Sequence, residues 1–465
     1  MRAMRAPPSG FGPALSALLG PRWRTDAAAL DAFAPGAGGD DRPAGIALPA
    51  SADEVAALVR ICRRHGAAVV ARGAGTSSTG SARPVGGEVL VSFERMRRIL
   101  AIEPANRIAV VEPGATNAEV QATLAPHGLF WPPDPASAET CTVGGNLACN
   151  AGGPRTVKYG ATRDNVLGLA AVTGTGELVR LGSATTKDAT GYDLTRVVVG
   201  SEGTLALIVE ATLKLAPLPA ARAGLRAFYA DAASAAAAVA RLMAQPVAPS
   251  MLEFMDATSL RLAREVGGAE LPEAGALLLI EADGDPATLP RALDALEAAA
   301  RGAGLLGLER AADQARAGRL WAARKALSHA QRAIAPAKLN EDVVVPVARI
   351  PDLVEAIQAL SRRHAIPIIA FGHAGNGNLH ANILYDPADP GQHARAHAAL
   401  PELFATVLAL GGTLSGEHGI GLAKRDHMRA AFDAPTLALM HAVKRAFDPD
   451  GILNPGKVLP PLADA

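Results

Sequence analysis

Two polar stretches of the sequence contain residues that could bind a metal ion. The segment from 372 to 382 reads GHAGNGNLHAN, and the segment from 415 to 421 reads SGEHGIG. Two neutral imidazoles and one carboxylate can bind a divalent cation such as Zn²⁺ or Mn²⁺ and leave coordination positions open for a substrate. We therefore predict a divalent metal site formed by His373, His380 and Glu417. A histidine that only packs in the core is the alternative for each imidazole.

The elements around the first stretch decide whether its polar side chains can meet. IPIIAF at 366–371 predicts a buried strand, and NLHANILYD from 378 predicts a second one, so GHAGNG connects them. Side chains alternate between the two faces of a strand, which places His380 and Asn382 on one face. His373 lies on the connection and can fold back towards His380.

The first glycine-rich loop lies in the N-terminal third of the chain. Residues 48–66 predict a helix, with a capping box that begins at Ser51 and a left-handed end at Gly66. The run AAVV at 67–70 predicts a short buried strand, and ARGAGTSSTG follows at 71–80. A strand that runs into glycines is typical of phosphate-binding loops, although a plain turn is the simpler interpretation.

Two well-known phosphate motifs do not fit this loop. A dinucleotide fingerprint needs a third glycine where Ser78 stands, and a Walker loop needs a lysine that the loop lacks. A nest of backbone N–H groups that holds a diphosphate remains as the functional interpretation. Further glycine-rich stretches at 142–153 and 190–217 favour it, because glycines let the backbone approach a flat ligand closely.

Composition limits the classes of partner. The chain has 465 residues, with 45 Lys and Arg against 45 Asp and Glu. This length predicts two or three domains. The charge balance gives no basic field for nucleic acid and no acidic tail, so a small-molecule substrate is expected.

Cysteine usage and the N-terminus bear on the compartment. Cys62, Cys141 and Cys149 form no CxxC pair, which favours a reducing compartment, the cytoplasm, and excludes an iron–sulfur cluster held by this chain. Residues 1–20 are interrupted by Pro and Gly, and we expect an untargeted, poorly ordered lead-in. The sequence has no run of about 18 apolar residues, so no membrane span is predicted.

The central part of the chain has a different pattern. From 220 to about 365, alanine-rich helical segments alternate with short apolar strands, as in an α+β layer with helices on one face. Pro217 and Pro219 mark the expected boundary with the glycine-rich part.

Taken together, the glycine stretches, GHAGNGNLH and SGEHGIG resemble those of the flavin-dependent D-2-hydroxyacid dehydrogenases of the vanillyl-alcohol-oxidase type. That family includes D-lactate dehydrogenases, glycolate oxidase flavoprotein subunits and D-2-hydroxyglutarate dehydrogenases. The resemblance runs from about residue 43 to FDPDGILNPGK at 447–457. It implies an α+β fold with a two-part, PCMH-type FAD-binding domain and a ferredoxin-like α+β cap. The expected division is a lead-in at 1–42, the FAD-binding domain at 43–219, the substrate or cap domain at 220–420, and a C-terminal segment at 421–465 that completes the flavin site.

The resemblance also implies which residues bind FAD. The first loop would hold the pyrophosphate, the second stretch would line the flavin, the third would lie near the adenosine, and the C-terminal return would approach the isoalloxazine. The implied residues are Arg72, Gly73, Ala74, Gly75, Thr76, Ser77, Ser78, Pro133, Thr142, Gly144, Gly145, Asn146, Asn150, Gly152, Gly200, Glu202, Gly203, Val209 and Asn454. The loop at 71–80 has no histidine that could attach the flavin, so we expect non-covalent FAD.

For the reaction, the resemblance implies oxidation of a D-2-hydroxy acid to the 2-oxo acid, with His418 as the general base. Arg324 and Ser328 stand one helical turn apart, and Arg324 would hold the substrate carboxylate bidentately. Lys338 and Asn382 are further expected substrate contacts. Arg319 and Lys325 compete with Arg324 for its role. The chain departs from the family at Asn376, where relatives carry aspartate, and so lacks one negative charge near the predicted metal.

Two other functions fit the same sequence. One is a flavin oxidoreductase of this fold that acts on a larger alcohol, in which the two histidines only pack. The other is a flavin subunit that serves for electron transfer in a larger assembly. Because the chain holds no cluster of its own, the electrons would pass to a quinone, an electron-transfer flavoprotein, an iron–sulfur subunit or oxygen. A homodimer is a further expectation.

Overall fold

The computed structural model describes residues 10–34, 41–266, 268, 271–310 and 330–462. Contacts between Cα atoms divide the chain into two compact units. The first comprises 1–151, 161–218 and 417–465, and the second comprises 152–160 and 219–416. The predicted division at 219 stands beside the end of the first unit at Leu218. The short segment 152–160 groups with the cap, whereas the sequence analysis assigned it to the FAD-binding domain.

A small sheet with a parallel centre begins the first unit. Helix α3 (Ala52–His65) connects two of its strands, and the Ser51 hydroxyl accepts a hydrogen bond from the Glu54 N–H at the start of this helix. Gly66 ends the helix with a φ of 64°, as predicted. The strand order is β1 (Trp23–Arg24), β2 (Gly45–Ala47), β4 (Val89–Ser92) and β3 (Val69–Arg72), with β2, β4 and β3 parallel.

The expectation of a poorly ordered N-terminus is wrong for its second half. Helix α1 spans Phe11–Leu19, and α2 spans Ala27–Phe33. Phe11, Leu15 and Leu19 recur every four residues, so α1 places all three on one face. All three side chains are buried in the core that covers α3 and β3. Burial of this apolar face therefore orders the segment despite its Pro and Gly residues.

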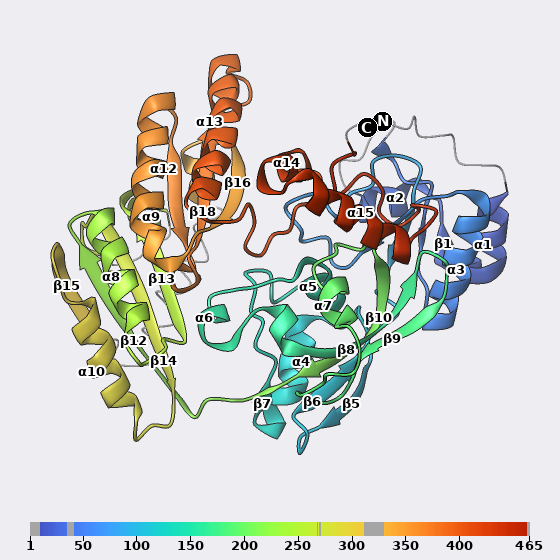
Figure 1. The fold of residues 1–465 in the computed structure, drawn as a ribbon, viewed down its shortest axis with the longest axis horizontal. Coiled ribbons are helices and arrows are strands. Elements are labelled where there is room, and N and C mark those ends of the chain that lie inside the picture. Colours follow the sequence, from blue (N-terminus) through green and yellow to red (C-terminus); the bar gives the residue numbers. More distant parts are fainter. Residues whose placement is uncertain (1–9, 35–40, 267, 269–270, 311–329, 463–465) are drawn as a thin grey trace. The chain divides into compact units, whose positions relative to one another are not determined.

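An antiparallel five-stranded sheet forms the other part of the first unit (Figure 1). Its strand order is β5 (Ile99–Glu103), β6 (Ile108–Val111), β10 (Ala206–Lys214), β8 (Val166–Thr173) and β9 (Leu178–Gly182). A two-stranded ribbon pairs β7 (Leu129–Phe130) with β11 (Ala216–Pro217). The remaining helices of this unit are α4 (Asn117–Leu124), α5 (Val143–Cys149), α7 (Leu194–Val198), α14 (Met428–Ala431) and α15 (Ala434–Phe447).

Helix α5 lies within the glycine-rich stretch at 142–153, which the sequence analysis did not assign to a helix. The Thr142 hydroxyl accepts a hydrogen bond from the Gly145 N–H and caps the helix. Asn150 ends it in the left-handed conformation. Val143 and Leu147 are fully buried, and this burial offsets the low helix propensity of Gly144 and Gly145.

The second unit contains an antiparallel seven-stranded sheet (Figure 1). The strand order is β15 (Leu305–Arg310), β12 (Ala221–Tyr229), β14 (Ala276–Gly284), β13 (Met251–Asp256), β17 (Ile368–Gly372), β18 (Asn378–Tyr385) and β16 (Ala337–Val344). Both predicted strands around GHAGNG are present as β17 and β18, and they pair with each other. The order places β18 between β17 and β16, although β16 comes first in the sequence.

Four helices of the second unit pack on its sheet (Figure 1). They are α10 (Leu289–Ala300), α8 (Ala232–Ala244), α12 (Ile350–His364) and α13 (Pro390–Ala409), each beside the next. The predicted alternation of helices and strands is therefore confirmed. Helix α9 (Ala257–Glu265) packs with Met251 and Met255 of β13, and α6 (Thr156–Tyr159) is a single turn. No helix of the described part of the chain is long and apolar enough to cross a membrane.

Candidate metal centre and flavin site

The connection between β17 and β18 brings the two histidines of GHAGNGNLH together. It contains a short 3₁₀ turn and a left-handed Gly377 with a φ of 76°. A Cβ on Gly372 would lie 2.9 Å from the Asn378 carbonyl oxygen, so glycine is required for this close return. The rings of His373 and His380 have centroids 5.3 Å apart and are nearly perpendicular. His373 therefore folds back towards His380, as predicted.

The face of β18 that carries His380 also carries Asn382. In the pairing of β18 with β16, His380 lies opposite Asp342 and Asn382 lies opposite Asn340. Asn382 is fully buried, yet neither its amide oxygen nor its amide nitrogen has a hydrogen-bond partner among the described residues. An unsatisfied buried polar group costs about 1–3 kcal/mol. This amide therefore favours a bound molecule that forms hydrogen bonds with it.

Glu253 is a residue of this site that the sequence analysis missed. It lies on β13, where its neighbour Phe254 pairs with Gly372 of β17. Glu253 is fully buried, and its carboxylate forms a short hydrogen bond with Nδ1 of His373. The available signal was a carboxylate in the middle of the apolar run MLEFMD, because an ionised group in a buried strand requires a partner.

Asp342 on β16 is the second missed residue. Its Oδ1 accepts a hydrogen bond from Asn378 Nδ2 at 2.7 Å. Its Oδ2 accepts bonds from the Ser415 hydroxyl at 2.8 Å and from the Gly416 N–H at 3.0 Å. Asp342 is fully buried, and these bonds fasten the segment that immediately precedes Glu417 to the edge of the sheet.

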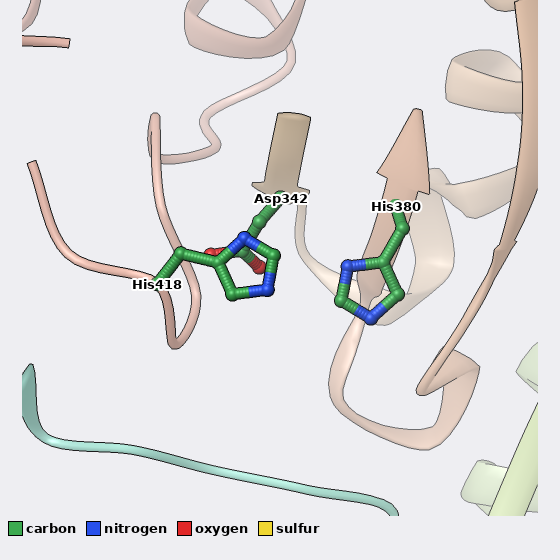
Figure 2. A group of neighbouring side chains, drawn as sticks. All are labelled: Asp342, His380 and His418. Atoms are coloured by element: carbon green, nitrogen blue, oxygen red, sulfur yellow. The ribbon is translucent and has the colours of Figure 1, made fainter. Parts of the chain in front are cut away.

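Glu417 and His418 directly follow Gly416, so the hydrogen bonds to Asp342 hold the start of the segment that carries them. Ligand atoms of His373, His380 and Glu417 all lie within 4.8 Å of one another. Asp342, His380 and His418 form a second such group, and Figure 2 shows both imidazole rings of this group beside the carboxylate. The first group is the predicted metal site. His418, the predicted general base, belongs to the second group and therefore also lies next to His380.

This donor set fits a divalent cation. Two imidazole nitrogens with one or two carboxylates suit Zn²⁺ and also Mn²⁺, whereas Ca²⁺ and Mg²⁺ prefer oxygen ligands alone. His373 and His380 are each only 7% exposed, so an ion there would be largely shielded from water. The two groups share His380, so a cation there would be bound either with His373 and Glu417 or with Asp342 and His418.

Only some of the predicted substrate contacts lie within the described residues. Lys338 lies on β16 and donates a hydrogen bond to Gln331 Oε1 at 3.0 Å. Burial lowers the pKa of its ammonium group, and the nearby Arg332 lowers it further. Arg324 and Ser328, together with the competitors Arg319 and Lys325, lie outside the described residues.

In the first unit, the first two predicted flavin segments lie against each other. A Cβ on Gly73 would lie 2.3 Å from the Thr142 hydroxyl, so only glycine permits this approach. Gly75 has a φ of 74°, and a Cβ there would meet the guanidinium of Arg72, which folds over the loop. Burial lowers the pKa of Arg72, and no acidic side chain in the described part of the chain pairs with it. A half-buried cation beside such a loop suits a diphosphate. Ala74, Thr76, Ser77 and Ser78 complete the loop.

The third glycine-rich segment and the C-terminal return also lie beside the segment that contains α5. The N–H groups of Gly200 and Glu202 donate hydrogen bonds to the carbonyls of Leu147 and Ala148, at 2.9 and 2.8 Å. Asn454 donates from Nδ2 to the carbonyl of Glu202 at 2.6 Å. Segments distant in the sequence are thereby held together around α5.

A polar atom without a partner lies among these segments. The Nδ2 atom of Asn146 is buried and has no hydrogen-bond partner among the described residues. With the close glycine approaches, this atom fits a flavin nucleotide. Two further predicted contacts are core positions, because Pro133 is buried and Val209 packs in the core with Leu207. Gly144, Gly152 and Gly203 stay predicted contacts as well.

Glu202 has a structural task that the sequence analysis did not foresee. It has a left-handed φ of 54°, and its carboxylate accepts hydrogen bonds from the N–H groups of Ile420 and Gly421, at 2.7 and 2.9 Å. The carboxylate is buried, and burial raises its pKa to about 7. These bonds fix the end of SGEHGIG, two residues after His418.

We expect the flavin to be bound without a covalent bond, because the loop at 71–80 offers no histidine. After acid precipitation of the purified protein, the yellow colour should remain in the supernatant. An absorbance spectrum of the supernatant and of the washed pellet measures the partition. Flavin that stays with the denatured chain would contradict the expectation.

Comparison with known families covers most of the chain. Residues 43–182 match the family described as "FAD binding domain". Residues 218–458 match the family described as "FAD linked oxidases, C-terminal domain". The first match contains the glycine loop after β3 together with α5. The second contains both histidines, Glu253, Asp342 and the SGEHGIG segment.

Individual proteins show the same relationship. The chain is 37% identical to the glycolate oxidase subunit GlcD of Bacillus subtilis, over 90% of this chain and 89% of the relative. It is 35% identical to a D-lactate dehydrogenase of Anaerostipes hadrus, over 90% of both chains. Among solved structures, p-cresol methylhydroxylase with bound substrate matches with a TM-score of 0.80 at 18% identity, over 96% of each chain. This last likeness concerns the fold alone.

Proposed function

The chain belongs to the FAD-linked oxidase family, and we propose that it oxidises a D-2-hydroxy acid to the 2-oxo acid. Within that family it is an FAD-dependent oxidoreductase of the 2-hydroxyacid dehydrogenase and oxidase group. D-lactate, glycolate and D-2-hydroxyglutarate represent the substrate class. The observation that carries the proposal is the group of ligand atoms from His373, His380 and Glu417 within 4.8 Å of one another. A 2-hydroxy acid suits such a group because its hydroxyl and one carboxylate oxygen can chelate one cation.

The residues of the centre have distinct tasks in this proposal. His373, His380 and Glu417 would hold a divalent cation, Zn²⁺ or Mn²⁺, which when bound acts as a Lewis acid and lowers the pKa of the substrate hydroxyl. The glycine segments would hold FAD, which when bound would supply the redox chemistry of the oxidation. Asn382 offers a buried amide that can form hydrogen bonds with the substrate.

His418 is the proposed general base. It directly follows Glu417, and its Nε2 lies 3.9 Å from a carboxylate oxygen of that residue. An imidazole in this place can take the proton that the substrate hydroxyl releases. Asp342 accepts a hydrogen bond from the Gly416 N–H, two residues before His418. This contact supports the role, because proton transfer requires a fixed distance between the base and the substrate.

For the substrate carboxylate we propose Arg324 and Ser328, with Lys338 as a further contact. Lys338 lies on the same face of β16 as Asn340, which is opposite Asn382 in the sheet. The lowered pKa of Lys338 reflects its burial, and a bound carboxylate would offset the cost of burying that charge.

Electrons must leave the flavin after each turnover. We propose an external acceptor, which is a quinone, an electron-transfer flavoprotein or an iron–sulfur subunit, and a homodimer as the assembly of this chain. The Bacillus subtilis relative is named as a subunit, which supports a partner for this chain. Cys62, Cys141 and Cys149 are free thiols, which fits a reducing compartment such as the cytoplasm.

A stopped-flow panel tests the function directly. We expect rapid loss of flavin absorbance when the anaerobic protein is mixed with at least one of D-lactate, glycolate and D-2-hydroxyglutarate. The L-enantiomers of lactate and 2-hydroxyglutarate serve as matched controls and should react slowly. Bleaching by a larger alcohol alone would favour the oxidoreductase in which the histidines only pack. If no alcohol bleaches the flavin, the electron-transfer subunit becomes the better account.

A further inference from the structure

We propose that Glu253 is a positioning residue that fixes the tautomer and the orientation of His373 and thereby sets the affinity of the centre for its metal. The inference rests on the proposed function, since it assigns a task towards the same cation. Glu253 and His373 both belong to the second unit. Glu253 is not itself a ligand; it lies behind the ligand His373, although it stands more than a hundred positions earlier in the sequence.

The position of Glu253 in the sheet makes the contact with His373 a consequence of strand pairing. β13 pairs with β17, and Phe254 and Met255 lie opposite Gly372 and Phe371. His373 is the next residue after Gly372, so its ring can reach back over the end of β13. The Glu253 carboxylate then forms a short hydrogen bond with Nδ1.

Burial shows that this carboxylate requires its partner. Glu253 has no exposed surface, and the side chains beside it on the same face, Met251 and Met255, belong to an apolar core. Moving an ionised carboxylate into such surroundings costs several kcal/mol unless it is paired and hydrogen-bonded. An apolar residue would stabilise the strand at lower cost. A buried glutamate at this position therefore indicates a task beyond packing.

The hydrogen bond determines which nitrogen of His373 can bind a metal. A neutral imidazole carries one N–H and one lone pair, and a carboxylate at Nδ1 favours the proton on that atom. Nε2 then carries the lone pair. Carboxylates that accept such a bond also raise the basicity of the ligating imidazole and fix the plane of its ring.

The negative charge of Glu253 is a second reason to expect an effect on metal affinity. A site with two imidazoles and Glu417 alone would leave a divalent cation with one net positive charge. Asp342 lies beside His380, and Glu253 adds a further negative charge next to the His373 ring, at its Nδ1. In a buried site of low dielectric this attraction is screened little. Loss of the charge should therefore weaken metal binding even when the hydrogen bond itself is kept.

Two substitutions separate the charge from the hydrogen bond. Glu253→Gln keeps an oxygen that can accept from Nδ1 but removes the charge, and Glu253→Leu removes both and fills the space. We expect the metal dissociation constant to rise about 10-fold in the first variant and about 100-fold in the second, the range known for such outer partners. Competition with a chromophoric chelator measures the constant.

Glu281→Gln is the matched control. Glu281 lies on the neighbouring strand β14 and faces the same side of the sheet, but it pairs with Ser250 and Arg155. The Glu281→Gln variant should bind the metal with the same dissociation constant as the parent protein. FAD content and the melting temperature of the metal-free proteins are measured alongside, because a merely structural role would lower stability without this graded loss of metal affinity.

The outcomes are distinct for the inference and for the function on which it rests. A parent that binds metal, with both Glu253 variants at the parental constant, overturns the inference and leaves the proposed function intact. A parent that binds no stoichiometric metal overturns both. The inference is also overturned if metal affinity falls in every variant, Glu281→Gln included, in proportion to the loss of melting temperature.

Discussion

Replacing Glu417 by alanine should remove the metal ion and abolish oxidation of the hydroxy acid, while the FAD absorbance spectrum stays that of the parent. Glu417 offers the carboxylate of the predicted ligand group, with its ligand atom within 4.8 Å of those of His373 and His380. Two imidazoles alone bind a divalent cation far more weakly, because the charge of the carboxylate is lost. The glycine segments that hold the flavin do not include Glu417, so FAD content should not change.

Elemental analysis, flavin absorbance and stopped-flow reduction measure these three effects on one preparation. Glu265→Ala, at an exposed position of α9, is the control and should keep metal, flavin and rate. Chelation of the parent should reproduce the Glu417 variant, and added Zn²⁺ or Mn²⁺ should restore the chelated parent alone. Should the Glu417 variant retain its metal while a variant of Asp342 loses it, the ion is held by the second group around His380 instead.

Replacing His418 by alanine should slow flavin reduction by about 10²- to 10⁴-fold, the usual effect of losing a general base. Metal and FAD should both remain, because the alanine variant keeps His373, His380 and Glu417. The rate should recover partly at high pH, since hydroxide can then take the proton from the substrate hydroxyl. Single-turnover stopped-flow measurements over a range of pH, with metal analysis of the same sample, provide both readouts.

The side chains around His418 allow the variant to distinguish a role as general base from a role as metal ligand. Its ring belongs to the group with Asp342 and His380, so a ligand role is the physical alternative to a base role (Figure 2). Loss of the metal in His418→Ala would establish the ligand role. A variant that reduces its flavin at the parental rate would show that another group takes the proton. His393→Ala, on the outer helix α13, is the matched control and should behave as the parent.

Local sequence was enough to find the parts of the site that depend on neighbours along the chain. The histidines of GHAGNGNLH lie at the ends of two adjacent strands joined by a short connection, so alternation and turn residues predict that they meet. Ser51 and Gly66 likewise mark the ends of α3 by capping rules. Residue type and spacing also indicated Glu417, although only through its motif.

Apolar burial decided the elements that local propensity misjudged. Helix α1 forms because Leu15 and Leu19 are buried in a core, and α5 forms although it contains two glycines. Propensity differs by at most about 1 kcal/mol per residue between Gly and Ala, which the burial of Val143 and Leu147 outweighs. Such burial depends on partners that are remote in the sequence.

The sequence by itself determined the family, the glycine segments and the two histidines, because those signals are carried by residue types at short spacing. Only the tertiary structure decided that Glu253 reaches His373 and that Asp342 fastens Gly416. Both contacts follow from the strand order β13, β17, β18, β16, in which strands from different parts of the chain become neighbours. Pairing over such distances is set by the packing of the whole sheet, and no local pattern around Glu253 or Asp342 contains it.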